Sequence, residues 1–440
     1  MRKKKILFIV PALPELRITK DNPIEHKKLF TLPYLGILYL AALTPKKFDV
    51  DVINEHIRPI DYNQNVDLVG ITVMTPMAPR AYEISKQFRR KGIKTILGGL
   101  HPTYMTAEAL KNCDSVVKGE AEEIWPQILR DFDTGKLKKV YQQKRPSDLS
   151  MLPLPRRELL PSENNPYDVI QATRGCVFKC EFCSVHKFMG NKFRMRPIDS
   201  VIDEIRQLNG KFISFVDDNL MANKRWAKEL FKSMIPLKKK WVSMATITIA
   251  LDDELLALAK KSGCLGFFIG IETMDIVNLE QTRKLHNKCM DTATAIKKMQ
   301  SYGLGISAGT VYGFDHDKND VFEKTLDFVK KNNLCILQVS PLVPFPGTDL
   351  YDRLRNEGRE LDKDWSKYDL YHVPFTPKNM SKKELIEGME YVRKNYYSWP
   401  SIMKRVIYNS RKLGMFSTMF NLFLNWSYKD NQKKGFHYPP

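Results

Sequence analysis

The sequence predicts an α/β protein with two domains in series: a Rossmann-like, doubly wound parallel sheet, then a partial (β/α)6 TIM-type barrel with a C-terminal helical region. Two observations support this prediction. Short β-rich runs alternate with helical patterns in two separate series, and a polar, proline-punctuated stretch divides them. We expect domains at residues 1–135 and 167–360, a linker at 136–166 and the helical region at 361–440.

The first series predicts a parallel sheet covered by helices on both faces. The predicted strands are 6–10, 48–53, 68–74, 94–99 and 115–119. The helical patterns between and after them are 34–43, 80–92, 106–111 and 120–132. In such sheets ligands bind outside the carboxyl ends of the strands. The segments MTPM (74–77), GGLHPT (98–103) and GEAEE (119–123) are therefore candidates for a binding site.

The second series predicts six β/α units, three-quarters of an eight-fold barrel. The predicted strands are 168–175, 212–218, 241–250, 264–272, 304–313 and 335–345. The helices that follow them are 198–208, 224–234, 252–263, 291–303, 320–333 and 348–358. Active sites of such barrels lie at the carboxyl ends of the strands. From about Ser381 the pattern becomes helical, aromatic and basic.

Composition limits the environment and the partners. The 440-residue chain carries a formal charge of +20, with lysines scattered along its length. This spread favours a solvated surface over a nucleic-acid, anionic-membrane or acidic-substrate site. No apolar run approaches the roughly 20 residues needed to span a bilayer, and the amino terminus lacks signal-peptide features. We therefore expect a cytoplasmic protein whose seven cysteines stay reduced.

The segment RGCVFKCEFCSVHKF (174–188) holds Cys176, Cys180 and Cys183 in the loop after the first barrel strand. A structural zinc site usually pairs two distant Cys-x-x-Cys elements, and His186 would complete only a cramped knuckle. Iron–sulfur clusters are held by closely spaced cysteine thiolates. A [4Fe–4S] cluster held by three thiolates keeps one iron open for a substrate or cofactor.

This CxxxCxxC loop, with Phe182 before the last cysteine, resembles the radical S-adenosylmethionine (SAM) superfamily. The resemblance implies that the open iron chelates SAM, whose reductive cleavage yields a 5′-deoxyadenosyl radical that abstracts hydrogen. Short motifs at successive strand ends match the family's SAM contacts, although acids replace the usual glycine pair at 217–218. The implied SAM contacts are Asp217, Asp218, Asn219, Glu272, Gly309, Gly313 and Pro344.

The amino-terminal domain resembles the cobalamin-binding domain of class B radical SAM enzymes, through GGLHPT (98–103) and VVKGEAEE (116–123). A flat corrin needs a sheet edge with glycine-rich loops that let the backbone approach the macrocycle. The implied cobalamin contacts are Met74, Thr75, Gly98, Gly99, His101, Gly119 and Glu120. The Asp-x-His-x-x-Gly motif of many cobalamin proteins is absent, so the lower axial ligand of cobalt stays unassigned.

The tail carries Leu413, Phe416, Phe420 and Leu424 at helical spacing. This stripe predicts a helix that packs on the barrel, or else an amphipathic face that lies on a membrane or lines a substrate channel. Residues 381–440 contain 11 Lys and Arg against 4 Asp and Glu, a net +7 that suits anionic lipid. The tail also resembles that of lipid-modifying family members.

We therefore predict a cobalamin-dependent radical SAM methyltransferase acting on an unactivated carbon of a hydrophobic substrate, such as a lipid. It would need a flavodoxin or ferredoxin as electron donor and would bind no nucleic acid. The first alternative is a non-methylating radical SAM enzyme that forms carbon–carbon bonds, cyclises or oxidises. The second is a zinc-dependent nucleic-acid-binding protein. The isolated cysteines at 113, 264, 289 and 335 are predicted to be small buried residues.

Overall fold

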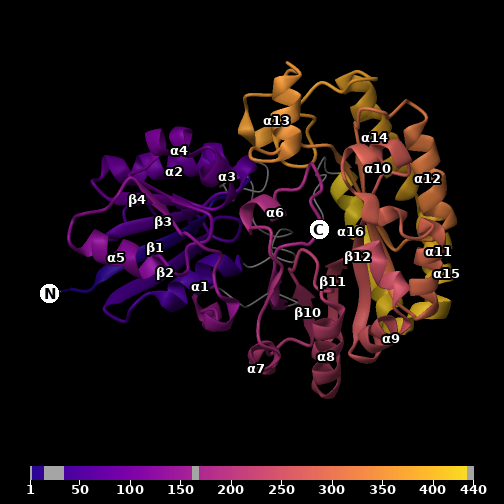
Figure 1. The fold of residues 1–440 in the computed structure, drawn as a ribbon, viewed down its shortest axis with the longest axis horizontal. Coiled ribbons are helices and arrows are strands. Elements are labelled where there is room, and N and C mark those ends of the chain that lie inside the picture. The colour runs from indigo at the N-terminus through magenta and orange to yellow at the C-terminus, as the bar shows by residue number, and fades with distance from the viewer. Residues whose placement is uncertain (1, 14–33, 161–167, 434–440) are drawn as a thin grey trace.

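The structure is a computed structural model that describes residues 2–13, 34–160 and 168–433. It contains two six-stranded parallel sheets, one in each of two domains that lie side by side, with the cysteine loop and the short helix α6 between them (Figure 1). Part of the predicted linker, 161–166, lies outside the described residues. The predicted α/β class is confirmed.

The amino-terminal sheet has the strand order β2-β1-β3-β4-β5-β6, with every neighbouring pair parallel. Its strands are β1 (Lys4–Val10), β2 (Phe48–Asn54), β3 (Leu68–Thr72), β4 (Lys94–Gly98), β5 (Ser115–Lys118) and β6 (Val140–Gln142). The five predicted strands are confirmed. The sixth was missed because it has only three residues, and it extends the sheet past the predicted domain end at 135.

Alternation along the strands explains why helices cover both faces of this sheet. In β1, Ile6 and Phe8 belong to the apolar cluster under α1 and α5, whereas Leu7 and Ile9 belong to the cluster under α2 and α4. Strands that are apolar on both faces are typical of buried parallel sheets. The helices are α1 (Leu35–Leu43), α2 (Ala78–Arg90), α3 (Leu100–Tyr104), α4 (Thr106–Asn112) and α5 (Trp125–Asp133).

The second sheet has the order β14-β13-β12-β11-β10-β7 and is also parallel throughout. Its strands are β7 (Asp168–Ile170), β10 (Phe212–Phe215), β11 (Lys240–Ala245), β12 (Cys264–Glu272), β13 (Gly305–Tyr312) and β14 (Ile336–Pro341). The helices of this domain are α6 (Val185–Phe188), α7 (Ile198–Gln207), α8 (Lys224–Met234), α9 (Asp253–Lys261), α10 (Ile276–Gln281), α11 (Thr292–Ser301), α12 (Val321–Lys331) and α13 (Asp349–Asn356). The six predicted β/α units are confirmed.

Two predicted strands are shorter than expected. The first, 168–175, divides into β7 and β8 (Thr173–Arg174), and β8 pairs antiparallel with β9 (Arg194–Met195). The division arises because the carboxylate of Asp217 accepts the N–H groups of Ala172 and Thr173, which therefore leave the ladder. The third, 241–250, ends at Ala245, and a 3-10 helix at Ile247–Leu251 follows it.

The helical C-terminal region begins at Lys382 rather than at 361. Residues 361–380 contain only a 3-10 turn at Trp365–Lys367 and one β-bridge from Leu361 to Phe375. The helices are α14 (Lys382–Tyr396), α15 (Trp399–Leu413) and α16 (Met415–Lys433). Helix α14 packs on α12 and β14, and α16 contacts α15 and β14. No helix in the described residues is long and apolar enough to cross a bilayer.

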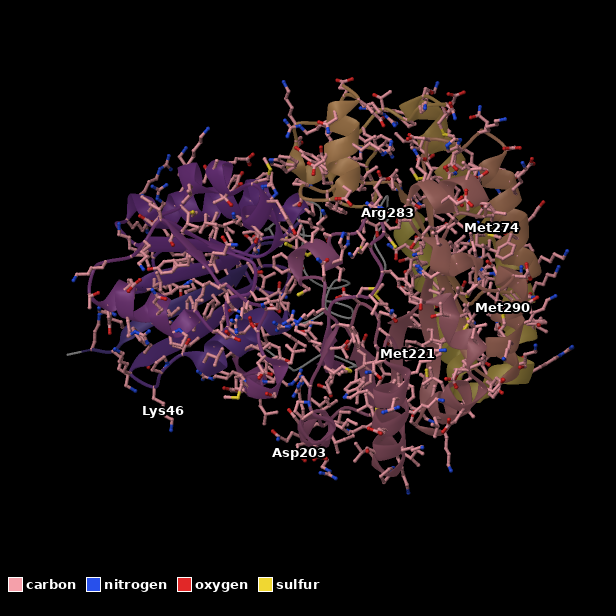
Figure 2. All side chains as sticks on the ribbon, in the orientation of Figure 1. Lys46, Asp203, Met221, Met274, Arg283 and Met290 are labelled. Carbon is pink, nitrogen blue, oxygen red and sulfur yellow. The ribbon has the colours of Figure 1, made fainter. Side chains whose placement is uncertain are left out.

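Three of the four isolated cysteines, Cys113, Cys264 and Cys335, are buried as predicted. Cys289 is exposed, so its predicted burial is wrong. It directly follows the 3-10 turn Leu285–Lys288, which connects α10 to α11 and buries Asn287 while Cys289 faces outward. Figure 2 shows Met290, the next residue, on the same side of the barrel as Met274.

Candidate active site

The three cysteines lie on a loop that begins where β8 ends. Gly175 opens the loop with a φ of 89°, and a Cβ atom there would come within 2.9 Å of a backbone carbonyl oxygen, so the turn requires glycine. The N–H of Cys183 donates to the carbonyl oxygen of Cys180 at 3.1 Å. Cys180 and Cys183 therefore share one tight turn, and Cys176 lies just after Gly175 at the start of the loop.

Burial keeps two of these thiols neutral. Desolvation raises the pKa of the Cys180 thiol and raises that of Cys183 to about 12, and the nearby thiols add to both effects. The three sulfur atoms are thus close enough to influence one another's charge. Because thiolates are the ligands of iron, a cluster that binds here displaces these protons.

The donor set is the type that holds an iron–sulfur cluster with one open iron, since three cysteines lie on one loop. Beside the loop, the Asn219 Nδ2 lies 3.9 Å from the Sγ of Cys176, and its buried Oδ1 has no hydrogen-bond partner. An N–H donor of a ligand bound next to the cysteines would satisfy that oxygen.

The acidic pair before Asn219 serves two roles. Asp217 is fully buried, and its carboxylate also accepts the hydroxyl of Thr173 at 2.6 Å. It therefore fixes the joint between β7 and β8 and is turned away from the site, contrary to the predicted SAM contact. Asp218 lines the cavity between the domains, and burial raises its pKa to about 6. Asp218 and Asn219 remain the candidates at this strand end.

Glu272 ends β12 in a left-handed conformation with a φ of 64°, which non-glycine residues adopt rarely and mostly at functional sites. The Lys284 Nζ lies 2.5 Å from its Oε1, and although burial alone would lower the pKa of Lys284, the Glu272 charge raises it. A Cβ atom on Gly270 would lie 2.2 Å from the same oxygen. Glu272 lines a pocket of 350 Å³ together with Gly309 and Phe182.

Two predicted SAM contacts lie outside this pocket. Gly313 is buried with a φ of 97°, and a Cβ atom there would lie 3.0 Å from Leu385, so it allows the close packing of α14. Pro344 is buried, while its neighbours Val343 and Phe345 line the pocket. The glycine motif at 309–313 and the proline motif at 343–348 therefore locate the correct strand ends. They do not identify which residue of each motif faces the pocket.

A cavity of 740 Å³ lies between the carboxyl ends of the amino-terminal sheet and the cysteine loop. The predicted cobalamin contacts that line it are Met74, Gly98, Gly99, Gly119 and Glu120. Gly99 has a φ of 100°, and a Cβ atom there would lie 3.0 Å from the Val73 nitrogen. The opposite wall includes Val185 and Met189 from the cysteine domain. A wide cavity with a glycine-lined edge and apolar walls fits a flat macrocycle.

Thr75 and His101 do not line this cavity. Thr75 is buried, and its Oγ1 has no partner. The imidazole of His101 is fully buried, with Nε2 3.1 Å from the Tyr82 hydroxyl and its ring 5.1 Å from that of Trp365. Burial lowers the pKa of His101 to about 4. The predicted cobalamin contact at His101 is therefore wrong, because tertiary packing draws the ring back into the domain.

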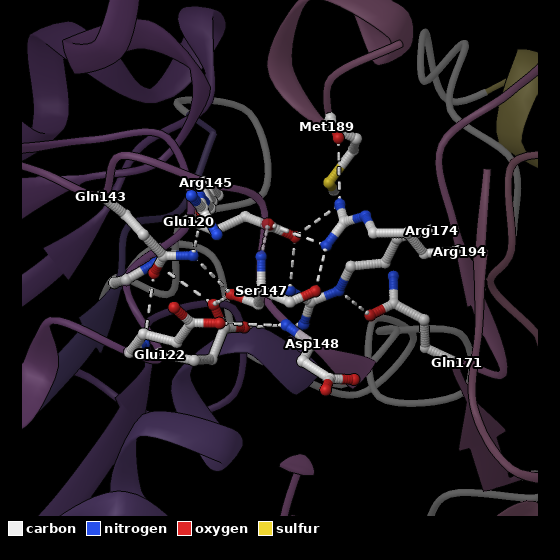
Figure 3. A network of polar contacts seen from close by, with 12 residues as sticks. Glu120, Glu122, Gln143, Arg145, Ser147, Asp148, Gln171, Arg174, Met189 and Arg194 are labelled. Carbon is white, nitrogen blue, oxygen red and sulfur yellow. Dashed lines mark hydrogen bonds and ion pairs between the residues drawn. The ribbon is translucent and has the colours of Figure 1, made fainter. Parts of the chain in front are cut away.

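Glu120 belongs to a buried polar network that joins the two domains (Figure 3). Arg174 donates to Glu120 at 2.8 Å and to Glu122 at 2.7 Å, and Arg194 donates to both oxygens of Glu120 at 2.9 and 3.0 Å. The N–H of Ser147 donates to Glu120 at 2.7 Å. The carboxylate of Glu120 is thus fully occupied, so this side chain fixes the loop after β5 rather than contacting a ligand.

Sequence reasoning missed the residues that join the two cavities. Met244 and Leu370 each line both the pocket at Glu272 and the cavity between the domains. Met244 could have been found, since alternation along β11 places it on the same face as Val242. Leu370 could not, because it lies in an irregular segment. Arg174 was visible two residues before Cys176, but its carboxylate partners are 52 and 54 residues away.

The chain matches two protein families. Residues 170–329 match the radical SAM superfamily, and residues 27–129 match the B12 binding domain. Among curated relatives, the bacteriochlorophyllide d C-12(1)-methyltransferase of Chlorobaculum tepidum is 31% identical, with 84% of each chain covered. The C-8(2)-methyltransferase of the same organism is 30% identical, over 89% of this chain and 91% of the relative. The hopanoid C-2 methylase of Rhodopseudomonas palustris is 26% identical, over 82% and 72%.

The fold agrees with these matches. The solved structure of the cobalamin-dependent SAM radical enzyme OxsB, with aqua-cobalamin and SAM bound, aligns over 99% of this chain and 76% of that one. The TM-score is 0.66 at 13% sequence identity. With its cysteine loop, its barrel pocket and the cavity above it, the chain belongs to the radical SAM superfamily, in the group that also carries a B12 binding domain.

Proposed function

We propose that this protein is a cobalamin-dependent radical SAM methyltransferase that methylates an unactivated carbon of a hydrophobic substrate. The observation that carries the proposal is the shared wall between the two cavities: Met244 and Leu370 line both. A group held at Glu272 and a group held at the glycine-rich sheet edge would therefore reach the same small volume. We also propose domain limits near 142 and 167, since β6 extends the first sheet to Gln142.

In this proposal each side chain has one task. Cys176, Cys180 and Cys183 hold the cluster, and the Asn219 Oδ1 accepts an N–H from the amino group of SAM. Glu272, kept in position by Lys284, accepts a ribose hydroxyl. When bound, the cluster and SAM supply a 5′-deoxyadenosyl radical, and cobalamin supplies a methyl group.

The chemistry of the walls favours a hydrophobic substrate. Phe182, Phe268, Val343 and Phe345 surround the pocket at Glu272, and the cavity between the domains is lined by Leu100, Val185 and other apolar side chains. The names of two curated relatives include bacteriochlorophyllide d and hopanoids, which are large apolar molecules. A substrate of this physical class would bury its surface against these walls.

The test uses anaerobically reconstituted protein with SAM, hydroxocobalamin, dithionite and a panel of apolar substrates. We expect 5′-deoxyadenosine and S-adenosylhomocysteine to form together, with one methyl group added per S-adenosylhomocysteine. Cys180→Ala should abolish both products, whereas the matched control Cys289→Ala should retain them, because Cys289 is exposed and does not belong to the CxxxCxxC loop. 5′-Deoxyadenosine without S-adenosylhomocysteine would support the non-methylating alternative instead.

We propose a flavodoxin or ferredoxin as the electron donor. Lys179, Lys187 and Lys192 are exposed on and beside the cysteine loop, and Arg283 lies close by (Figure 2), paired with Asp349 at the start of α13. Positive charge near the cluster would attract an acidic donor. Lys179→Glu should slow reduction by flavodoxin, with the rate with dithionite unchanged. Equal rates with both reductants would contradict this choice.

We also propose that the C-terminal helices touch an anionic membrane surface. On α15, Trp399, Met403 and Ile407 recur every four residues and are 47%, 44% and 52% exposed. Lys404 and Arg411 are exposed beside them. Apolar side chains flanked by basic ones suit the interface of an anionic bilayer. Co-sedimentation with phosphatidylglycerol vesicles that is lost in Met403→Glu would support this contact; equal sedimentation of the variant would refute it.

A further inference from the structure

The barrel interior is hollow below the pocket at Glu272. Four of the strand positions that line this lower space carry a small side chain or none: Ser214 on β10, Gly266 on β12, and Gly305 and Ser307 on β13. In most (β/α)8 barrels bulky branched residues fill such layers. Here the small residues leave room for a chamber of 370 Å³, which lies within the size range of ligand pockets.

Helix α16 lies along the open side of the incomplete barrel and lines part of this chamber. The ring of Phe420 lies 5.4 Å from that of Phe212 on β10, while Leu424 packs on the cluster formed by Cys335 and Ile336 at the start of β14. The helix therefore contacts both β10 and the start of β14. The chamber stays partly open to solvent and is otherwise lined by apolar side chains such as Leu265.

The chamber meets the reactive pocket at one aromatic residue. Met244 and Phe268 line both spaces. A Cβ atom on Gly309, in the upper pocket, would lie 3.1 Å from the Phe268 Cζ, so the ring covers that glycine. A ligand that extends downward from the SAM pocket has only to displace or pass this ring.

One polar group in the chamber lacks a partner. Asn421 on α16 is 5% exposed and lines the chamber, and its Nδ2 has no hydrogen-bond partner. The Asn425 Nδ2 contacts the Asn421 Oδ1 at 2.7 Å and the Cys335 carbonyl oxygen at 3.0 Å, which leaves the Nδ2 as the unpaired atom of the Asn421 amide. An unpaired donor in an apolar chamber requires an acceptor on the occupant.

We propose that this chamber binds an aliphatic chain of the substrate, with an oxygen atom near its end that accepts from the Asn421 Nδ2. The proposal rests on the methyltransferase function above and extends it. It assigns the apolar tail to the barrel interior, so the carbon to be methylated lies above Phe268, where the two cavities meet.

The test measures binding of 1-hexanol to 1-dodecanol to the cluster- and cobalamin-loaded protein by calorimetry. Each added methylene should tighten binding roughly fourfold until the chamber is full. Ser307→Leu should end this rise at a shorter chain, and Ser214→Leu, from the neighbouring side of the chamber, should do the same if the first variant misfolds by circular dichroism. The control Met419→Ala, on the same helix but 66% exposed, should match the wild type.

A second comparison tests the polar end. Asn421→Leu should weaken 1-octanol about fivefold, the loss of one hydrogen bond, while 1-chlorooctane binding changes little. The proposal would be overturned if wild-type affinity did not depend on alkanol length. It would also be overturned if affinity in both serine variants rose with chain length as far as in the wild type. Alkanol binding needs no turnover, so this test is independent of the methyltransferase assay. The chamber proposal can hold even if no 5′-deoxyadenosine forms, and it can fail even if 5′-deoxyadenosine forms.

Discussion

Replacing Arg174 with methionine should destabilise the protein more than any substitution of a surface arginine. Arg174 is 4% exposed and donates to Gln171 at 2.9 Å as well as to Glu120 and Glu122. It lies two residues before Cys176 and reaches across to the loop after β5. The substitution removes the charge while keeping an apolar chain of similar length.

The magnitude follows from which partners remain. Glu120 keeps Arg194, but Glu122, at 9% exposure, keeps only the Ser147 hydroxyl at 3.2 Å and one backbone N–H. Removing one partner of a buried ion pair costs about 3–5 kcal/mol, because the remaining charge stays desolvated. We expect the unfolding free energy of Arg174→Met to fall by that amount. The double variant Arg174→Met/Glu122→Gln should recover part of it.

Urea unfolding of the anaerobically purified apoprotein, followed by tryptophan fluorescence and circular dichroism, gives this difference. Arg206→Met is the matched control: Arg206 pairs with Asp203 at 2.8 Å, but both side chains are about 60% exposed. Exposed pairs contribute about 0–1 kcal/mol. If the unfolding free energy of Arg174→Met falls no more than that of the control, the buried ion pairs of this network do not hold the two domains together as described.

The pH dependence adds a second check. Burial alone would raise the pKa of Glu122, but Arg174 lowers it below its ordinary 4.5. Because the folded pKa lies below the unfolded one, the stability from this carboxylate is present above pH 4.5 and is lost as the pH falls through the folded value. The difference between wild type and Arg174→Met should therefore be constant near neutral pH and shrink below pH 4.5. A constant difference down to pH 3 would argue against the coupling.

Two further predictions test the barrel. Gly266→Ala should lower the unfolding free energy by about 1–3 kcal/mol, since a Cβ atom there would lie 2.1 Å from the Gly305 carbonyl oxygen; Gly36→Ala in α1, with open space around it, should not, and equal midpoints in urea would contradict the packing. Burial raises the pKa of Asp317 from 3.8 to about 7, so the folded state binds its proton more tightly and stability declines as the pH rises between these values. Asp317→Asn should flatten that part of the stability profile measured by urea titration, and an unchanged slope would show that Asp317 is ionised in the folded protein.

The order of elements was predictable because parallel strands leave a strong pattern. Strands buried on both faces appear as short apolar runs, and such runs predict eleven of the strands, including every strand of four residues or more. The misses have local causes. β6 is three residues long, and the division of the first barrel strand depends on Asp217, a side chain 45 residues away from Ala172. No window of sequence contains that hydrogen bond.

Individual site residues were harder to predict than the site itself. The motifs located the correct strand ends, but backbone direction decided which neighbour faces inward: Val343 and Phe345 rather than Pro344. His101 follows a diglycine at the sheet edge, yet the segment around Trp365 packs on it and keeps it in the core. The strained φ of Glu272 and its pairing with Lys284 depend on a bulge in β12. These features come from tertiary contacts that no local pattern encodes.

The position of the buried charges explains how two separately folded sheets can share one reaction space. Met244 and Leu370 can line both cavities only if the sheet edge at Gly98 and the cysteine loop keep a fixed separation. Apolar packing alone would let the two domains slide slightly against each other. Three ion pairs connect two arginines with two glutamates, Arg174 and Arg194 with Glu120 and Glu122, and their hydrogen bonds are directional. Such a network adds little net stability, because its charges must be desolvated, but it fixes the position of one domain relative to the other. We therefore infer that its main contribution is geometric, and an Arg174→Met/Glu122→Met variant that folds stably but forms 5′-deoxyadenosine without methyl transfer would show this directly.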